Sequence, residues 1–271
     1  SSYWVAGWGR GAVKVNDRCL LGSSPISKRG AHSMQTHETP LLLLVQANVA
    51  PEHEAAFNSW YYHHVPKLLE IPGFNWGRRY IGLRGDIKYM ALYELSGPEV
   101  LPRMYGPEGR DPRAIAEREM FDALEGLTDM RSNIYVQRSG THLGHPLLTA
   151  DKPVSVVMCD CVVPEKEDEF NAWYDHSHVP NLTQVPGYAS GARFQLFEHP
   201  ILEGRGQGPK YLALYELDSI EAVPGMADPE HRNPAARAEL ARWEEYGLPL
   251  VDNMSWNVYR PIAKHWPFVQ G

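Results

Sequence analysis

Two histidines occupy equivalent places in two similar stretches of this 271-residue chain. The first stretch reads NSWYYHHVPKLLEIPGF and contains His64, and the second reads NAWYDHSHVPNLTQVPGY and contains His178. The ordinary pKa of imidazole lies close to neutrality, so it can accept and release protons under physiological conditions. The repeated His-Val-Pro therefore predicts general acid–base chemistry at His178 or His64. The alternative is that each histidine caps a helix break at the following proline.

The adjacent histidines do not complete a metal site. On a helix, His176 and His178 would point about 200° apart, and His63 and His64 about 100° apart. Helical metal sites favour histidines four residues apart instead. The glycine-rich nucleotide motifs and the serine-hydrolase elbow are also absent from the sequence. We therefore expect chemistry without a metal or another cofactor.

Tyrosines recur on one face of a strand in the related segments KYMALYEL and KYLALYEL. Tyr89 and Tyr93 share a face in the first segment, as Tyr211 and Tyr215 do in the second, because residues two apart in a strand point the same way. We expect these tyrosines to face an enclosed cavity, where their phenols could donate hydrogen bonds to a substrate oxygen. The aliphatic face would then pack against helices. Alternatively, the tyrosines are ordinary core aromatics.

Other polar residues recur at equivalent places in the two segments. Arg79 and Arg193 could clamp a carboxylate or an enolate, although surface salt bridges are an equal alternative. Asn133 and Asn257 recur on the last strands and would add polar groups for substrate binding. The sequence thus predicts a pocket with paired sets of polar side chains.

The two copies differ around the histidine. Asp175 precedes His178 by one helical turn and could orient or charge it, whereas Tyr62 stands at this place in the first copy. The first copy also has one residue fewer before His64, which on a continuous helix would rotate this histidine by about 100° relative to its twin. Alternatively, the first copy lacks a local helix bulge that the second copy has, and such bulges often occur at functional sites. The second copy has a longer strand-to-strand loop, EHPILEGRGQGPK, whose glycines favour a mobile lid. We therefore expect the second copy to carry the principal site.

The similarity between the copies extends well beyond the histidines. Phe57 aligns with Phe170, and KYMALYEL aligns with KYLALYEL. The segment RDPRAIAE, which ends at Glu117, aligns with RNPAARAE, which ends at Glu239. Agreement over this length indicates a tandem duplication.

The sequence pattern of each copy predicts the order strand, helix, strand, strand, helix, strand. Prolines and acidic residues favour helix starts at Pro51-Glu52 and Pro164-Glu165, and we expect both helices to be interrupted at His-Val-Pro. This is the ferredoxin-like βαββαβ unit of the α+β class. Two such sheets, each with one bare face, can cover one another as a barrel. The expected strands are 41–49, 75–83, 87–95 and SNIYVQR in the first copy, and 154–163, 190–198, 210–217 and WNVYR in the second.

The segment FNAWYDHSHVPNLTQVPGYASGARF resembles the signature of the EthD-like group in the dimeric α/β-barrel superfamily. Members of this group read Trp-Tyr, then His-(Ile/Val)-Pro, Val-Pro-Gly and a basic strand. The resemblance spans 41–260 as two copies and implies an intrachain dimeric α/β barrel. The superfamily includes polyketide cyclases, muconolactone-type isomerases, cofactor-free monooxygenases, haem-degrading enzymes and proteins without known activity.

Four regions are expected along the chain. Residues 1–38 show no clear period and are interpreted as an N-terminal arm or an artificial leader, with the native start near Met34. Residues 39–139 form the first repeat, 140–152 a linker, and 153–271 the second repeat with a C-terminal tail.

Composition limits the partners. A net charge of −7 without a basic run disfavours nucleic acid, and no segment reaches the roughly 20 apolar residues that would span a membrane. Three cysteines are too few for a disulfide framework and favour the cytoplasm. We expect a small-molecule substrate and consider a homodimer of the two-repeat chain.

These observations predict a cofactor-independent isomerase, cyclase or lyase. Its substrate would be a small oxygenated anionic compound, such as an aromatic ring-cleavage product or a polyketide-like enol. His178 or His64 would move the proton, Tyr211 and Tyr89 would stabilise the enolate, and Arg193 would hold the acid group. The alternatives are a haem-binding or cofactor-free monooxygenase of the same superfamily and a non-catalytic module that binds small molecules.

Overall fold

Two parts of the chain fold with the same order of strands and helices. The computed structural model describes residues 39–141, 152–206, 208–227, 233–262 and 266–267. The first half comprises β1 (Leu41–Val49), α1 (Glu54–Leu69), β2 (Phe74–Arg84), β3 (Tyr89–Leu95), α2 (Leu101–Tyr105), α3 (Pro112–Asp122) and β4 (Leu127–Gly140). The second half comprises β5 (Val154–Cys161), α4 (Glu167–Trp173), the π-helical turn η4 (Tyr174–His178), α5 (Val179–Leu182), β6 (Tyr188–Leu196), the 3-10 turn η5 (Pro200–Leu202), β7 (Tyr211–Leu217), α6 (Ala222–Ala227), α7 (Pro234–Arg242), the π-helical turn η6 (Trp243–Gly247), β8 (Val251–Pro261) and β9 (Trp266–Pro267).

The predicted βαββαβ order is therefore confirmed in both halves. The expected N-terminal arm and most of the expected linker lie outside the described residues, so the predicted domain boundaries stay predictions. The helix starts follow the local sequence. Asp111 caps α3 by accepting a hydrogen bond from the Arg113 amide at 2.9 Å, and Asn233 caps α7 by accepting one from the Ala236 amide at 2.8 Å.

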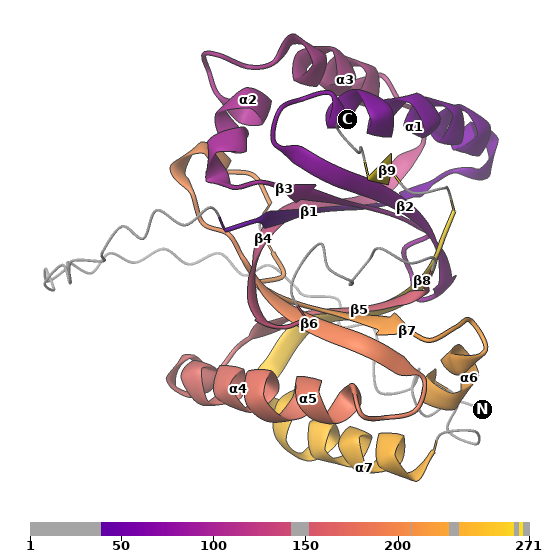
Figure 1. Cartoon of the computed structure of the whole chain (residues 1–271), viewed down its shortest axis with the longest axis vertical. Helices are drawn as coiled ribbons and strands as arrows, with labels where there is room; N and C mark the ends of the chain where they lie inside the picture. The colour runs from indigo at the N-terminus through magenta and orange to yellow at the C-terminus, as the bar shows by residue number, and fades with distance from the viewer. Residues whose placement is uncertain (1–38, 142–151, 207, 228–232, 263–265, 268–271) are drawn as a thin grey trace, which may run out of the picture. The chain divides into compact units, whose positions relative to one another are not determined.

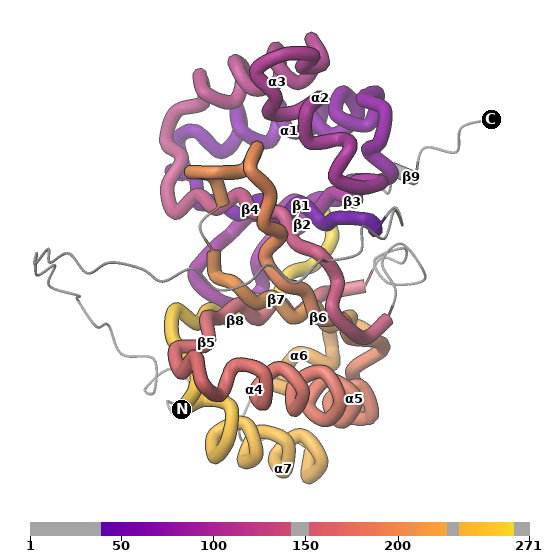
Figure 2. Tube along the Cα trace, turned by 90° about the vertical axis from the view of Figure 1, so that its left-hand side faces the viewer, coloured from indigo at the N-terminus to yellow at the C-terminus, as the bar shows by residue number. Residues whose placement is uncertain are grey.

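In the described part of the chain, all the strands join one nine-stranded sheet in the order β3-β1-β4-β6-β7-β5-β8-β2-β9, and a further β2–β3 pairing closes it into a barrel (Figure 1). The two halves meet along two seams, β4 with β6 and β8 with β2, and every pairing is antiparallel. The helices of each half cover opposite outer sides of the barrel, as both views show (Figures 1 and 2). The intrachain barrel expected from the sequence is the observed architecture.

The barrel interior is packed with side chains from both halves. Its buried cluster is mainly aliphatic and includes Leu92 and Leu214 from β3 and β7. Tyr93 and Tyr215, on the other face of these strands, belong instead to the clusters under the helices. The predicted orientation of β3 and β7 is therefore wrong. The aliphatic side chains fill the barrel because close packing there requires apolar shapes. On the helix side, Tyr89 packs against Phe57 of α1 and Tyr211 against Phe170 of α4.

The helices that carry the two histidines differ. Helix α1 continues without a break through Pro66, whereas the second half has α4, a π-helical turn and α5. The expected break at His-Val-Pro is therefore wrong for the first half. In the second half, η4 accommodates the extra residue as a bulge within the helix. No helix among the described residues is long and apolar enough to span a membrane.

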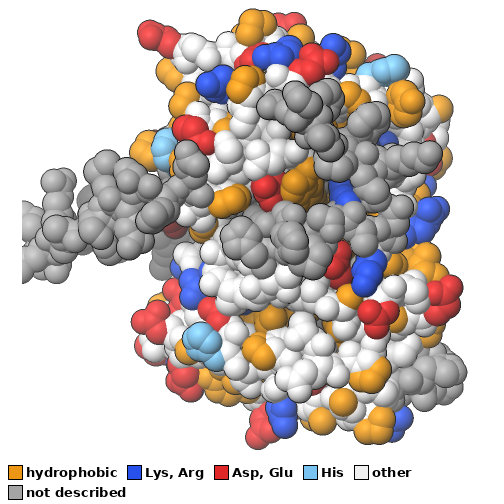
Figure 3. Space-filling view, in the orientation of Figure 1, with side chains coloured by type: hydrophobic (Ala, Val, Ile, Leu, Met, Phe, Trp, Pro, Cys, Tyr) orange, Lys and Arg blue, Asp and Glu red, His pale blue; other side chains and the backbone are white. Residues whose placement is uncertain are grey.

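The surface carries mixed charge. On the face shown in Figure 3, acidic, basic and apolar side chains are interspersed over both halves. The visible basic side chains do not gather into one patch on this face.

Candidate functional site

In the first half, His64 and Glu117 form a partly buried pair between α1 and α3. The Nδ1 atom of His64 lies 2.6 Å from the Oε2 atom of Glu117. Trp60, one helical turn before His64, stacks on the imidazole with 4.0 Å between the ring centroids. The carboxylate and the indole together fix the position and the plane of the imidazole.

The surroundings of His64 favour the neutral imidazole. Burial lowers the pKa of His64 below its ordinary value, and Arg79 adds to this effect, while the hydrogen bond and the charge of Glu117 oppose it. The carboxylate of Glu117 accepts the Nδ1 proton, so the neutral ring carries its lone pair on Nε2. Among the described residues, no partner is recorded for Nε2. The ring is therefore arranged as a base.

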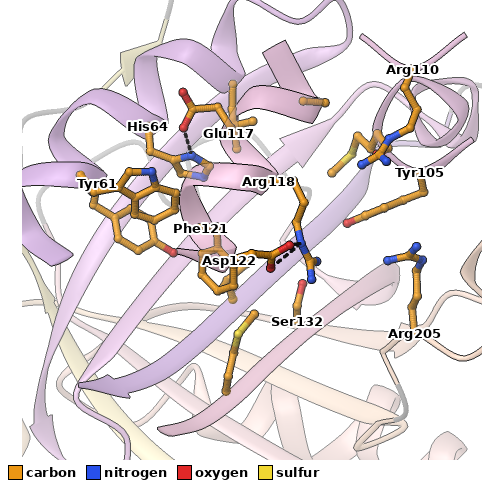
Figure 4. A pocket seen from close by; sticks show the side chains of 16 residues that line it. Tyr61, His64, Tyr105, Arg110, Glu117, Arg118, Phe121, Asp122, Ser132 and Arg205 are labelled. Atoms are coloured by element: carbon orange, nitrogen blue, oxygen red, sulfur yellow. Dashed lines mark hydrogen bonds and ion pairs between the residues drawn. The ribbon is translucent and has the colours of Figure 1, made fainter. Parts of the chain in front are cut away.

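A pocket of about 370 Å³ adjoins this pair (Figure 4). His64, Trp60 and Tyr61 contribute to its wall from α1, and Glu117 and Phe121 contribute from α3. Its remaining wall combines apolar and charged residues, namely Val45, Leu68, Met104, Tyr105, Arg110, Ala114, Arg118, Asp122, Met130, Ser132 and Arg205. The volume and the mixed lining suit a small ligand with an apolar body and a few polar groups.

The second half repeats the pair in tighter surroundings. The Nδ1 atom of His178 lies 2.8 Å from Oε1 of Glu239, and the His178 ring stacks on both Trp173 and Trp243. The two side chains are 8% and 3% exposed, against 12% and 10% for the first-half pair. Burial lowers the pKa of His178 as well, against the opposing effect of Glu239. Trp243 covers the second pair, at the position where the first half has the smaller Phe121.

Both histidines reach their glutamates despite the different residue spacing. The expected rotation of about 100° assumed a continuous α-helix in both copies. The π-helical turn η4 contains the additional residue and keeps His178 directed toward α7. The predicted rotation is therefore wrong, whereas the predicted alternative, a local bulge that the first copy lacks, is confirmed.

Asp175 is part of this turn but does not bond to His178. Its carboxylate accepts hydrogen bonds from Ser139 at 2.8 Å and Arg193 at 3.0 Å, with Arg138 at 3.3 Å. The predicted pairing with the histidine is wrong because Glu239 from α7 takes that position.

Arg79 and Arg193 lie beneath the helices rather than in the pocket. The guanidinium of Arg79 lies 4.2 Å from the centre of the Tyr61 ring and donates to Asn58 at 2.9 Å. Arg193 is likewise 4.3 Å from the Tyr174 ring. Both arginines are buried, and Arg79 does not line the pocket. Their observed contacts support the aromatic layer between helix and sheet.

The predicted tyrosines belong to the same layer. The Tyr89 hydroxyl accepts from Asn58 at 3.1 Å, and the Tyr211 hydroxyl accepts from Asn171 at 2.8 Å and donates to Glu167 at 2.8 Å. Tyr89 does not line the pocket, so a substrate role for it stays a prediction without a contact to support it.

Tyr93 and Tyr215 are also buried under the helices. The Tyr93 hydroxyl is buried without a recorded hydrogen-bond partner in the described part of the chain, and burial raises its pKa well above the ordinary value. The Tyr93 ring lies edge-on to His64 at 6.4 Å, whereas Tyr215 contacts Tyr188. Neither tyrosine lines the first-half pocket.

Asn133 and Asn257 hold the loops of the opposite half. Asn133 donates to the Gly208 carbonyl at 3.1 Å, and Asn257 accepts from the Ile87 amide at 3.2 Å. The two residues therefore have equivalent positions at the two seams. Their observed partners are backbone atoms, so substrate binding by them stays a prediction.

Glu117 and Glu239 are not among the site residues that the sequence predicts. Both were visible as identical positions in the repeated segments RDPRAIAE and RNPAARAE. A glutamate on a helix surface forms many possible pairs, and only the packing of the two helices brings these two residues to the histidines.

Comparison with family models found no match, and comparison with curated protein sequences found none. Several solved structures do match. An anthrone oxidase-like protein has a TM-score of 0.61 and 16% identity, covering 84% of this chain and 93% of that chain. A candidate monooxygenase from Fusobacterium nucleatum has a TM-score of 0.56 and 10% identity, covering 85% and 95%. A candidate chlorite dismutase has a TM-score of 0.50 and 11% identity, covering 83% and 95%. These structures share the dimeric α/β-barrel fold, and at such identities the likeness shows the fold alone.

Proposed function

We propose that the chain is an enzyme that uses the His64–Glu117 pair as a general base in the first-half pocket. The observation that supports this most directly is an imidazole whose Nδ1 atom lies 2.6 Å from a carboxylate oxygen beside a pocket of about 370 Å³. The substrate class is a small oxygenated compound with an acidic C–H next to a carbonyl. Isomerisation, cyclisation and elimination of such compounds all begin with removal of that proton.

Each atom of the pair has a distinct part in the proposed step. Nε2 of His64 takes the proton, the electrons of the C–H bond form a C=C bond, and the π electrons of the carbonyl move to its oxygen to give an enolate. Glu117 stabilises the resulting imidazolium through Nδ1. Burial raises the pKa of Tyr61 to about 12, so this pocket residue stays protonated and can donate to the enolate oxygen. Where the substrate carries a conjugated double bond, the enolate extends to the γ carbon, and return of the proton from Nε2 to that carbon completes an isomerisation.

The family assignment is part of the proposal. The EthD-like resemblance and the origin of the halves by tandem duplication are supported by the common βαββαβ order and by the equivalent His–Glu pairs. The cytoplasmic location and a homodimer of this chain stay predictions.

Proton exchange tests the proposed function before the substrate is known. The protein is incubated in D₂O with cyclic and aromatic ketones, including anthrone and 2-tetralone, and deuterium incorporation is followed by NMR. We expect exchange above the buffer rate, and its loss in His64→Gln. No acceleration with any ketone, from a folded protein, would contradict the general-base assignment and favour the non-catalytic binding module.

Oxygen chemistry is the second candidate function. The contact between Nδ1 of His64 and the Glu117 carboxylate favours this candidate. Histidines that bind a metal through Nε2 usually make the same contact through Nδ1. His64 would hold a haem iron in this way, and the haem would supply oxygen activation. In the cofactor-free version, the enolate itself would react with O₂. Oxygen consumption with anthrone, with and without haemin, and a visible absorption band on adding haemin distinguish these versions from simple exchange.

A further inference from the structure

The long β6–β7 loop of the second half lies against the first half. In Figures 1 and 2 this orange segment extends beside α2, away from the helices of its own half. The amide of Phe197 donates to the Ile134 carbonyl at 2.8 Å, and the Tyr135 hydroxyl donates to the Pro209 carbonyl at 2.9 Å. Ile201 and Leu202 pack against the apolar core of the first half. The loop is therefore fixed to the half that contains the His64 pocket.

The middle of this loop forms part of the pocket wall. Arg205 lines the His64 pocket and also an adjoining pocket of about 280 Å³, and the two pockets share Tyr105, Arg118, Met130 and Ser132 as well. Gly206 has φ +55°, and a Cβ atom there would lie 3.0 Å from the Ser132 carbonyl oxygen. This close approach needs glycine, and it holds the adjacent Arg205 at the pocket. The first half has only a short turn between β2 and β3 at the equivalent place.

Positive charge gathers at this end of the pocket. Arg110, Arg118 and Arg205 line it together with the acidic residues Glu117 and Asp122. Glu117 is engaged by His64, and Asp122 by Arg118, whereas no carboxylate within ion-pair distance of Arg205 is recorded among the described residues. The lining thus carries an excess of positive charge on a chain whose formal net charge is −7.

Tyr105 lines the pocket together with these arginines. The guanidinium of Arg205 lies 5.2 Å from the centre of the Tyr105 ring. Burial raises the pKa of Tyr105 to about 12, while Arg205, Arg118 and Arg110 oppose that rise. Figure 4 shows Arg110, Arg118 and Arg205 around Tyr105 in the lining of this pocket, where an anion could meet more than one guanidinium group.

We propose that Arg205, supplied by the second half, determines the specificity of the first-half pocket by binding a carboxylate group of the substrate, with Arg118 beside it. This inference rests on the proposed function for its pocket and names the substrate class more closely, as an aromatic or cyclic carboxylate whose reactive C–H faces His64. The β6–β7 loop thus contributes to the pocket of the first half and is not a lid over the second half, to which it belongs.

Binding of a matched acid and amide tests the proposal without requiring turnover. The probes are 2-naphthoate and 2-naphthamide, which have similar shapes and differ in charge, and their affinities are measured by calorimetry at low salt. We expect the unaltered protein to prefer the acid and Arg205→Gln to bind it about ten-fold more weakly, because a charge-assisted contact is lost. Affinity for the amide should not change. Arg205→Lys should lie between the two, because it keeps the charge without the planar fork.

Arg260→Gln is the matched control, because Arg260 is exposed on β8 and lines neither pocket. Equal affinity for acid and amide in the unaltered protein, including no binding of either, would overturn the proposal, as would an Arg205→Gln protein that binds the acid normally. Acid-selective binding without proton exchange would reject the proposed function and keep this inference. Exchange of neutral ketones without a preference for acids would keep the proposed function and reject this inference.

Discussion

The two His–Glu pairs have the same internal contact but different surroundings. His64 and Glu117 adjoin a pocket, whereas Trp243 stacks over His178, whose partner is Glu239. The same contact thus joins two helices in each half, but a larger aromatic ring packs on the imidazole in the second half. We expect the residue at this position, Phe121 or Trp243, to decide how easily a ligand reaches the imidazole.

We expect the largest effect when the histidines of the two pairs are replaced and the exchange rate is measured. Replacing His64 by Gln should lower the exchange rate by about 10²–10⁴-fold, because the general base is removed. The same change at His178 should leave the rate within about three-fold, because Trp173 and Trp243 enclose that ring. Deuterium exchange at neutral pH measures both, with circular dichroism to check folding. A greater loss in His178→Gln would return the principal site to the second half, as the sequence favours.

The π-helical turn should also make the two halves differ in how much one aligned residue contributes to stability. Asp175, 9% exposed in its side chain, bonds to the buried Arg193, whereas Tyr62 at the aligned position of α1 is 68% exposed. Asp175→Ala should cost about 3–5 kcal/mol in the free energy of unfolding, because it leaves a buried guanidinium without its charge partner.

Tyr62→Ala supplies the matched measurement, with an expected change of at most about 0.5 kcal/mol because the side chain is exposed. Urea denaturation gives both values. Similar losses in the two variants would show that the turn does not direct Asp175 toward a required contact.

A smaller effect is expected from the charge of Glu117. Because the pKa of His64 is lowered, kcat/KM should stay constant as pH falls to about 6.5 and decline only below it. Glu117→Gln removes the negative charge that raises this pKa, so the decline should move to still lower pH. The rate on the plateau should fall about ten-fold, because the imidazolium loses its stabilising charge.

The pH–rate profile of Glu117→Gln provides the check, and Glu239→Gln provides the comparison. An unchanged acid limb in Glu117→Gln would show that His64 is not the group that titrates. A shifted limb in Glu239→Gln alone would assign the titration to His178.

The fold was largely predictable from the sequence. Repeated strand patterns and the helix starts at Pro51-Glu52 and Pro164-Glu165 are local signals, and they recur in both copies. The direction of the tyrosines was not predictable in the same way. Alternation shows that Tyr211 and Leu212 point to opposite faces of β7, but both faces are buried, so periodicity cannot decide which one meets the helices.

The site was predictable only in part. The motif identified His64 and His178, but their partners come from residues far along the chain. The extra residue near His178 predicted either a different histidine direction or a local bulge, and residue spacing alone could not decide between them. The loop glycines were visible, but only the seam between β4 and β6 places Arg205 at the other half's pocket.

The smallest expected effect comes from the residue that covers the second pair. Trp243→Phe gives the second half the side chain of Phe121 and should cost about 1–2 kcal/mol in the free energy of unfolding, because buried aromatic contacts with Trp173 and His178 are lost. Urea denaturation measures this loss. The reciprocal Phe121→Trp should narrow the His64 pocket and slow exchange without a comparable loss of stability, since Phe121 is only partly buried. If Trp243→Phe is neutral, or if Phe121→Trp exchanges at the full rate, then covering of the imidazole does not explain the difference between the halves.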